Sequence, residues 1–117
     1  MALLTLADLS SQRRNAWRNK RVLVVCQKGN SRSVGMANLL KQCGADALAA
    51  GSQTSSYSTL CMLYEWAEVI IVMSQRFAEL VPEDRRWKVL VCEVGTDTYA
   101  RPLSVRLVHQ CVSFLQR

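Results

Sequence analysis

Apolar residues gather in four short runs, and mixed polar segments separate them. The runs are Arg21–Cys26, Asp46–Ala50, Glu68–Met73 and Trp87–Cys92. Three of these runs are almost continuously apolar, which is typical of strands that are buried on both faces. Asp46–Ala50 is Ala-rich, and its place between two helical segments favours a strand more than its composition does. The pattern therefore predicts four strands.

Between and after these runs, apolar residues recur at helical spacing. The predicted helices are Ser33–Cys43, Ser56–Trp66, Gln75–Val81 and Leu103–Leu115. Gly44 supplies a stop signal after the first of them, and Pro102 stands where a helix commonly starts. Strands that alternate with helices predict an α/β fold, here a four-stranded parallel sheet flanked by helices on both faces.

An additional segment precedes the first strand. Residues 5–20 predict an extra N-terminal helix with Leu6 and Leu9 on its apolar side, followed by a basic tail. We therefore expect a basic helical extension over residues 1–20 and a single domain over residues 21–117. We interpret the basic tail as a solvated face, with a nucleic-acid or protein partner site as the alternative. A nucleic-acid partner is not expected, because no recognisable nucleic-acid-binding motif accompanies these charges.

The composition favours a soluble protein with an anionic partner. The 117 residues carry a formal net charge of +6, and half of them are hydrophobic. No apolar run approaches the roughly 20 residues that a membrane-spanning helix needs. The five cysteines have neither a Cys-x-x-Cys spacing nor a zinc-ligand pattern, and scattered thiols favour a reducing compartment. We expect a cytoplasmic protein with no membrane partner.

The turn after the first strand carries the candidate chemistry. It reads Cys26-Gln27-Lys28-Gly29-Asn30-Ser31-Arg32-Ser33, with a strand before it and a helix after it. The carboxyl end of the first strand in an open α/β sheet is the expected ligand crevice. A buried strand-end cysteine with an ordinary surface arginine is the alternative, but the flanking elements favour a phosphate-binding loop.

Physical reasons favour anion binding by this loop. Gly29 and Asn30 tolerate the dihedral angles of a loop whose backbone N–H groups point inward. The helix that begins near Arg32 adds positive potential, which favours the thiolate form of Cys26. The Arg32 guanidinium can hold two phosphate oxygens, and Ser33 can donate a hydrogen bond to the sulfur. Lys28 adds charge at the rim.

With these features the sequence resembles the low-molecular-weight protein tyrosine phosphatase family. The similarity covers Arg21 to about Arg117 and rests on four stretches: VLVVCQKGNSRS, MANLL at 36–40, AAG at 49–51 and WAEVIIVM at 66–73. The resemblance implies a phosphate loop after the first strand and a two-step reaction through a cysteinyl-phosphate on Cys26, with no metal and no other cofactor. It also implies a phosphorylated substrate, namely a phosphotyrosine protein or an aryl phosphate.

The same resemblance suggests a general acid near the last helix. Asp97 matches the position of the family's acidic residue, and an acid there would protonate the leaving oxygen and later activate water. Tyr99 would then be an aromatic wall beside the substrate. Stabilising a turn is the alternative role for Asp97.

The loop also departs from the family pattern. Gly29-Asn30 lies one position later than usual, Val34 replaces a common Pro, Ser31 stands where many members carry a second Cys, and Thr98 replaces a Pro after the acid. These differences leave Cys26, Arg32 and Ser33 intact.

Other residues receive structural roles. Cys43, Cys61, Cys92 and Cys111 are expected to be core thiols, and His109 a structural or surface residue. Trp17, Trp66 and Trp87 are expected to pack in the molecule. Two alternative functions stay open: a thiol-dependent arsenate reductase in which Cys61 or another thiol resolves oxidised Cys26, and a non-catalytic phosphate-binding regulatory module.

Overall fold

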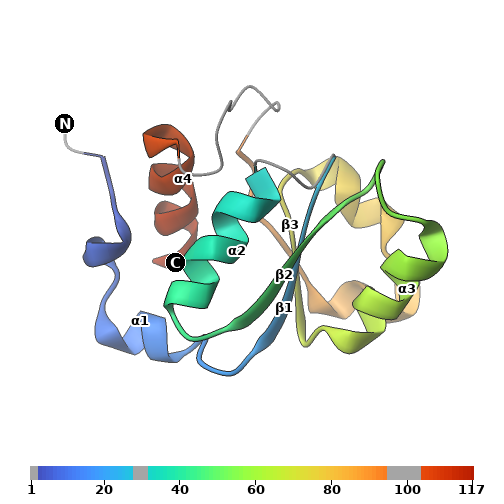
Figure 1. Cartoon of the computed structure of the whole chain (residues 1–117), viewed down its shortest axis with the longest axis horizontal. Coiled ribbons are helices and arrows are strands. Elements are labelled where there is room, and N and C mark those ends of the chain that lie inside the picture. Colours follow the sequence, from blue (N-terminus) through green and yellow to red (C-terminus); the bar gives the residue numbers. More distant parts are fainter. Residues whose placement is uncertain (1–2, 28–31, 95–103) are drawn as a thin grey trace.

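The computed structural model describes residues 3–27, 32–94 and 104–117, and its centre is a four-stranded parallel sheet (Figure 1). The strands are β1 (Arg21–Cys26), β2 (Asp46–Gly51), β3 (Val69–Val72) and β4 (Val89–Val91), in the order β2-β1-β3-β4. All three pairings are parallel, so the carboxyl ends of the strands share one end of the sheet. The predicted α/β fold and parallel sheet are confirmed.

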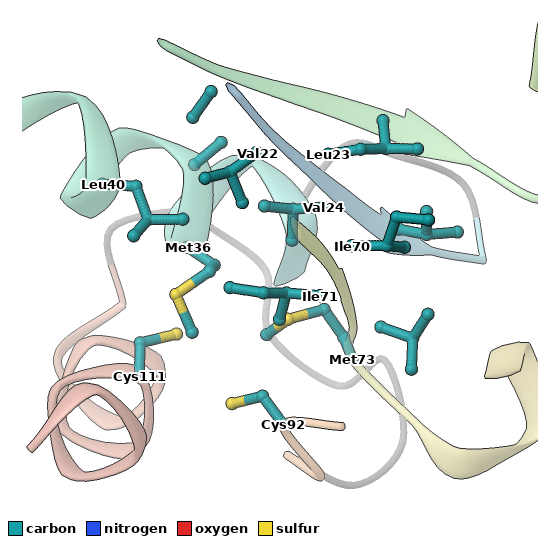
Figure 2. Packing of buried hydrophobic residues seen from close by; sticks show 14 of the residues in the cluster. Val22, Leu23, Val24, Met36, Leu40, Ile70, Ile71, Met73, Cys92 and Cys111 are labelled. Carbon is teal, nitrogen blue, oxygen red and sulfur yellow. The ribbon is translucent and has the colours of Figure 1, made fainter. Parts of the chain in front are cut away.

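Strand β1 lies at the centre of the molecule. Its residues from Val22 to Cys26 are fully buried, and it pairs with β2 on one side and β3 on the other. The continuous apolar run RVLVVC suits this position, because both faces of the strand are covered and neither needs polar side chains. The core around it includes Met36, Leu40, Ile70 and Ile71 (Figure 2).

Helices cover both faces of the sheet. Figure 1 shows α2 (Arg32–Gln42) and α4 (Val105–Leu115) on one side, and α3 (Tyr57–Trp66) on the other. The predicted short helix after β3 is a 3₁₀ helix, η2 (Gln75–Leu80), and a second 3₁₀ helix, η3 (Glu83–Lys88), follows it. Gly44 adopts φ 88° just after α2, as its stop signal predicts.

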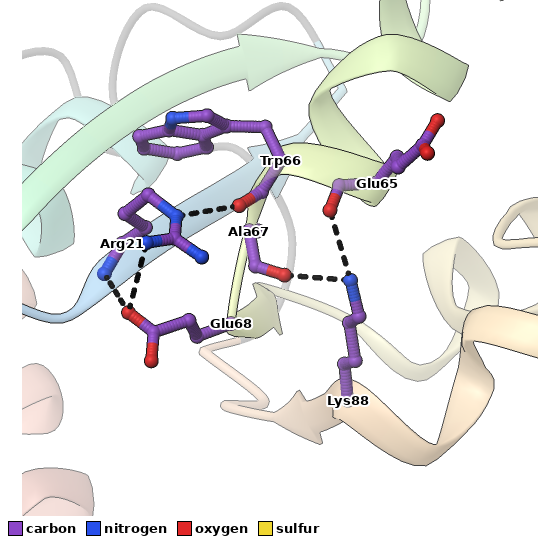
Figure 3. A network of polar contacts seen from close by, with 6 residues as sticks. All are labelled: Arg21, Glu65, Trp66, Ala67, Glu68 and Lys88. Carbon is purple, nitrogen blue, oxygen red and sulfur yellow. Dashed lines mark hydrogen bonds and ion pairs between the residues drawn. The ribbon is translucent and has the colours of Figure 1, made fainter.

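Two cations cap the carboxyl end of α3 (Figure 3). Arg21 donates from Nε to the Trp66 carbonyl at 2.8 Å, and Lys88 Nζ donates to three carbonyls at 2.7–3.2 Å, those of Tyr64, Glu65 and Ala67. These carbonyls lie at the end of the helix, where intrahelical donors run out. Arg21 from the predicted basic tail and Lys88 from η3 therefore tie the start of β1 and the start of β4 to α3.

The N-terminal segment differs from the single helix predicted over residues 5–20. It forms a 3₁₀ helix, η1 (Leu6–Asp8), and a five-residue helix, α1 (Ser11–Asn15). Ser10 starts α1 because its hydroxyl accepts from the Arg13 N–H at 3.2 Å. Arg14 reaches back to the carbonyls of Leu6 and Leu9 at 2.8 and 3.2 Å. These bonds hold a bend between two short helices.

Two further details differ from expectation. Trp87 is 77% exposed, because it lies on η3 outside the sheet, so its predicted packing role is wrong. Strand β4 begins two residues later than the run Trp87–Cys92 predicts, since η3 extends to Lys88. Within the described ranges, no helix has the length and hydrophobicity needed to cross a bilayer.

Candidate active site

Three predicted site residues meet where β1 ends and α2 begins. Cys26 is the last residue of β1, and Arg32 and Ser33 are the first two of α2. All three side chains are fully buried. The predicted loop residues Lys28, Gly29, Asn30 and Ser31 lie outside the described residues, as do Asp97 and Tyr99, so their roles stay predictions.

The thiol of Cys26 lies against the hydroxyl of Ser33. The Sγ–Oγ distance is 3.1 Å, and either group can be the donor. A thiolate on Cys26 can only accept, so the hydroxyl would then donate to it. Cys26 and Ser33 are seven positions apart in the chain, and their side chains meet because α2 begins close to the end of β1.

Arg32 rests on an aromatic ring from another part of the chain. Its guanidinium carbon lies 5.7 Å from the centroid of Phe77, a residue of η2 that is 4% exposed. Arg76 lies over the same ring at 4.8 Å and donates from its guanidinium to Gln27 Oε1 at 3.3 Å. Cation–π contacts of this kind favour one position of a guanidinium over others. Phe77 and Arg76 thus connect η2 to both ends of the loop.

Sequence reasoning missed Phe77 and Arg76. Nothing local distinguishes them, because QRFAEL reads as an ordinary short helix. Their contact with Arg32 and Gln27 depends on the loop after β3 passing beside the loop after β1. The available signal was topological, since the carboxyl ends of neighbouring parallel strands share one end of the sheet.

The backbone of β1 stays anchored past its last residue. The Cys26 carbonyl accepts from Ser52 N–H at 2.8 Å, and the Gln27 carbonyl accepts from Gln53 N–H at 2.9 Å. A pocket of about 170 Å³ opens beside Gln27, lined by Gln27, Ser52, Gln53, Arg76, Phe77 and Leu80. The predicted substrate-binding residue Gln27, which directly follows Cys26 in the chain, therefore lies in the wall of a pocket.

Searches of known proteins give likeness in structure and not in sequence. No protein-family profile and no curated protein sequence matches the chain. The YwlE arginine phosphatase from Geobacillus stearothermophilus superposes with a TM-score of 0.55 and 18% identity, covering 83% of this chain and 86% of that one. Vibrio vulnificus Wzb, solved with benzylphosphonate, gives a TM-score of 0.52 and 15% identity, covering 84% and 92%. Both are low-molecular-weight protein tyrosine phosphatases.

This chain has the low-molecular-weight protein tyrosine phosphatase fold.

Three of the four cysteines other than Cys26 are buried. Cys43, Cys92 and Cys111 are buried, whereas Cys61 on α3 is partly exposed, and all are free thiols. A hydrogen bond with Cys92, together with burial, raises the pKa of Cys111 (Figure 2), and burial raises that of Cys43. The predicted core role is confirmed for these three.

His109 has a structural contact, as expected. Its Nδ1 accepts from the Leu4 N–H at 2.8 Å, which ties the N-terminal segment to α4. No group of three or more His, Cys, Asp or Glu side chains is arranged to hold a metal ion among residues 3–27, 32–94 and 104–117.

Proposed function

We propose that the chain is a phosphatase that hydrolyses phosphomonoesters through a cysteinyl-phosphate on Cys26, acting on phosphotyrosine proteins or aryl phosphates. The observation that carries this proposal is the 3.1 Å approach of Cys26 Sγ to the Oγ of Ser33, the residue that follows the buried Arg32. A nucleophile on Cys26 would thus have a hydrogen-bond partner in Ser33, and Arg32 would supply a cation from the first residue of α2. The likeness to two phosphatases supports the same chemistry.

The proposed reaction has two displacements at phosphorus. In the first, the Cys26 thiolate forms an S–P bond, the P–O bond to the leaving group breaks, and Asp97 supplies the proton to the departing oxygen. In the second, Asp97 takes a proton from water, the water oxygen bonds to phosphorus, and the S–P bond breaks. Arg32 would hold two non-bridging oxygens throughout. Ser33 would stabilise the sulfur anion before attack and after release.

The location that we propose is the cytoplasm. All five cysteines are free, and one of them is the proposed nucleophile. A nucleophilic thiolate and its neighbours survive best where thiols are kept reduced.

The decisive experiment compares wild type with Cys26→Ser, using p-nitrophenyl phosphate turnover and trapping of a phosphorylated protein by rapid quenching with denaturant at alkaline pH. We expect the wild type to turn over and to yield a phosphoprotein, and Cys26→Ser to do neither. Cys61→Ser is the matched control, because that thiol is partly exposed on α3. Turnover by Cys26→Ser at the wild-type rate would refute the mechanism.

A substrate panel separates the remaining possibilities. It contains phosphotyrosine, phosphoserine, phosphoarginine and arsenate; phosphoarginine is included because YwlE is described as an arginine phosphatase. We expect phosphotyrosine to be the best substrate. Thiol-dependent arsenate turnover that is lost in Cys61→Ser, without phosphatase activity, would indicate a reductase. Tight vanadate binding without turnover of any substrate would indicate a non-catalytic module.

A further inference from the structure

A second and larger pocket lies at the amino end of the sheet, opposite Cys26. It encloses about 330 Å³, within the range of small-molecule sites. Four parts of the chain form it: α1 with the turn after it, the start of β3, the edge strand β4, and the last turn of α4. Its lining residues are Arg13, Ala16, Trp17, Lys20, Val69, Leu90, Phe114, Leu115 and Arg117.

The walls of this pocket are apolar and partly open to water. Trp17 and Phe114 pack against the core but stay partly exposed. Leu90, in the middle of β4, is 43% exposed. Trp17, Leu90 and Phe114, which come from three separate parts of the chain, therefore line the pocket with large apolar side chains that are partly exposed. Removing this surface from water would favour an apolar occupant of matching size.

The rim of the pocket is basic. Arg13, Lys20 and Arg117 line it, and none of the lining residues is acidic. None of these three cations forms an ion pair with a described carboxylate. Glu68 is electrostatically close to Lys20, but it accepts from the Arg21 N–H at 3.1 Å and pairs with the Arg21 guanidinium at 3.7 Å. The rim thus offers three cations that form no ion pair with a carboxylate of the described residues.

The helix ends indicate where an anion would lie within the pocket. The last turn of α4 presents carbonyl oxygens, whose partial negative charge opposes an anion close to Arg117. Arg13 and Lys20 lie on the other side, on α1 and just before β1. An anionic group is therefore best placed near Arg13 and Lys20, with its apolar body against Trp17, Leu90 and Phe114.

We propose that this pocket binds a small amphipathic anion, an aromatic or aliphatic body that carries one carboxylate or phosphate. The site is separate from the loop at Cys26, because the two lie at opposite ends of β1. The proposal does not rest on the phosphatase activity, and binding can be measured without turnover.

The test titrates the whole protein with 2-naphthoate and, as a neutral match, 2-naphthalenemethanol, following backbone and indole N–H signals by NMR. We expect saturable shifts at Trp17 and Leu90, with a Kd on the order of 1 mM or tighter for the carboxylate. The neutral alcohol should bind about tenfold more weakly, which is the typical effect of losing one charge-assisted hydrogen bond.

Variants locate the site and its charge. Arg13→Gln combined with Lys20→Gln should weaken 2-naphthoate about tenfold or more, whereas Arg18→Gln, an exposed neighbour outside the pocket, should not. Leu90→Glu should abolish binding, and Cys26→Ser should leave it intact. Equal affinity for the alcohol, shifts centred on Gln27 and Ser52, or no saturation up to about 10 mM would overturn the proposal.

Discussion

An arginine lies near each end of strand β1, and the two arginines differ in their surroundings. Near the carboxyl end, Arg32 is fully buried and lies over the ring of Phe77. At the amino end, the Arg21 side chain is 49% exposed and is engaged with the Trp66 carbonyl and Glu68. Desolvating a guanidinium is expensive unless polar groups surround it, so a folded chain rarely buries one without a reason. The same residue type therefore has different surroundings at the two ends: Arg21 caps a helix, and buried Arg32 is the residue that we propose binds the phosphate.

The most direct test of the different roles of Arg32 and Arg21 is the same substitution at both positions. Arg32→Lys should lower kcat/KM for p-nitrophenyl phosphate by about 10²–10³-fold, because an ammonium cannot hold two phosphate oxygens in a planar fork. Arg21→Lys should leave kcat/KM unchanged. Initial rates at matched protein concentration measure both, and equal losses would show that Arg32 acts only through stability.

The next largest effect concerns the support of Arg32. Phe77→Leu keeps the site apolar but removes the aromatic face, and we expect about a tenfold loss in kcat as the guanidinium loses its fixed position. Trp87→Leu is the control, because Trp87 is 77% exposed on η3. A purely structural role would lower the melting temperature and leave kcat of the folded fraction intact. Rescue by Phe77→Tyr, which retains the ring, would support positioning.

At the amino end the expected effect is on stability. Lys88→Met removes one ammonium from three carbonyls at the end of α3, and we expect it to lower the free energy of unfolding by about 1–2 kcal/mol. Urea denaturation measures this, with Lys41→Met, an exposed lysine of α2, as the control. Turnover by the folded protein should be unchanged, and a loss of activity without a loss of stability would contradict the division of roles.

The smallest effect appears only in acid. The Arg21 N–H holds the pKa of Glu68 below its ordinary value of 4.5. A carboxyl group whose pKa is lowered by folding stabilises the folded protein at pH values above its ordinary pKa. This stabilisation is lost as the pH falls through the lowered pKa. Glu68→Gln should therefore be slightly less stable than wild type at neutral pH, and the difference should vanish in acid. Thermal unfolding at several pH values checks this; a difference that grows in acid would contradict it.

Much of the fold was predictable because local pattern and topology agree. The apolar runs at β1 and β3 and the Gly44 stop signal follow from spacing and composition alone. The bend near Ser10 and the late start of β4 did not, because both depend on distant partners. The Arg14 side chain donates hydrogen bonds to the carbonyls of Leu6 and Leu9, and Lys88 donates to carbonyls more than twenty residues earlier in the chain.

The candidate site divides in the same way. Cys26, Arg32 and Ser33 are close in sequence, so a motif brings them to attention. The contact of Phe77 with Arg32 could not be predicted, because it forms only when η2 lies beside the start of α2. The full burial of Arg32 was equally unpredictable, since it depends on side chains from other elements.

The central place of β1 makes its backbone a reporter on the whole molecule. Its amides from Val22 to Val25 are buried and lie between two paired strands, so they should exchange with deuterium only when the entire structure opens. Their exchange rates therefore measure global stability in every variant above. A variant that loses activity with unchanged exchange at these amides has an altered site. Faster exchange at these amides means that the global stability of the variant is lower.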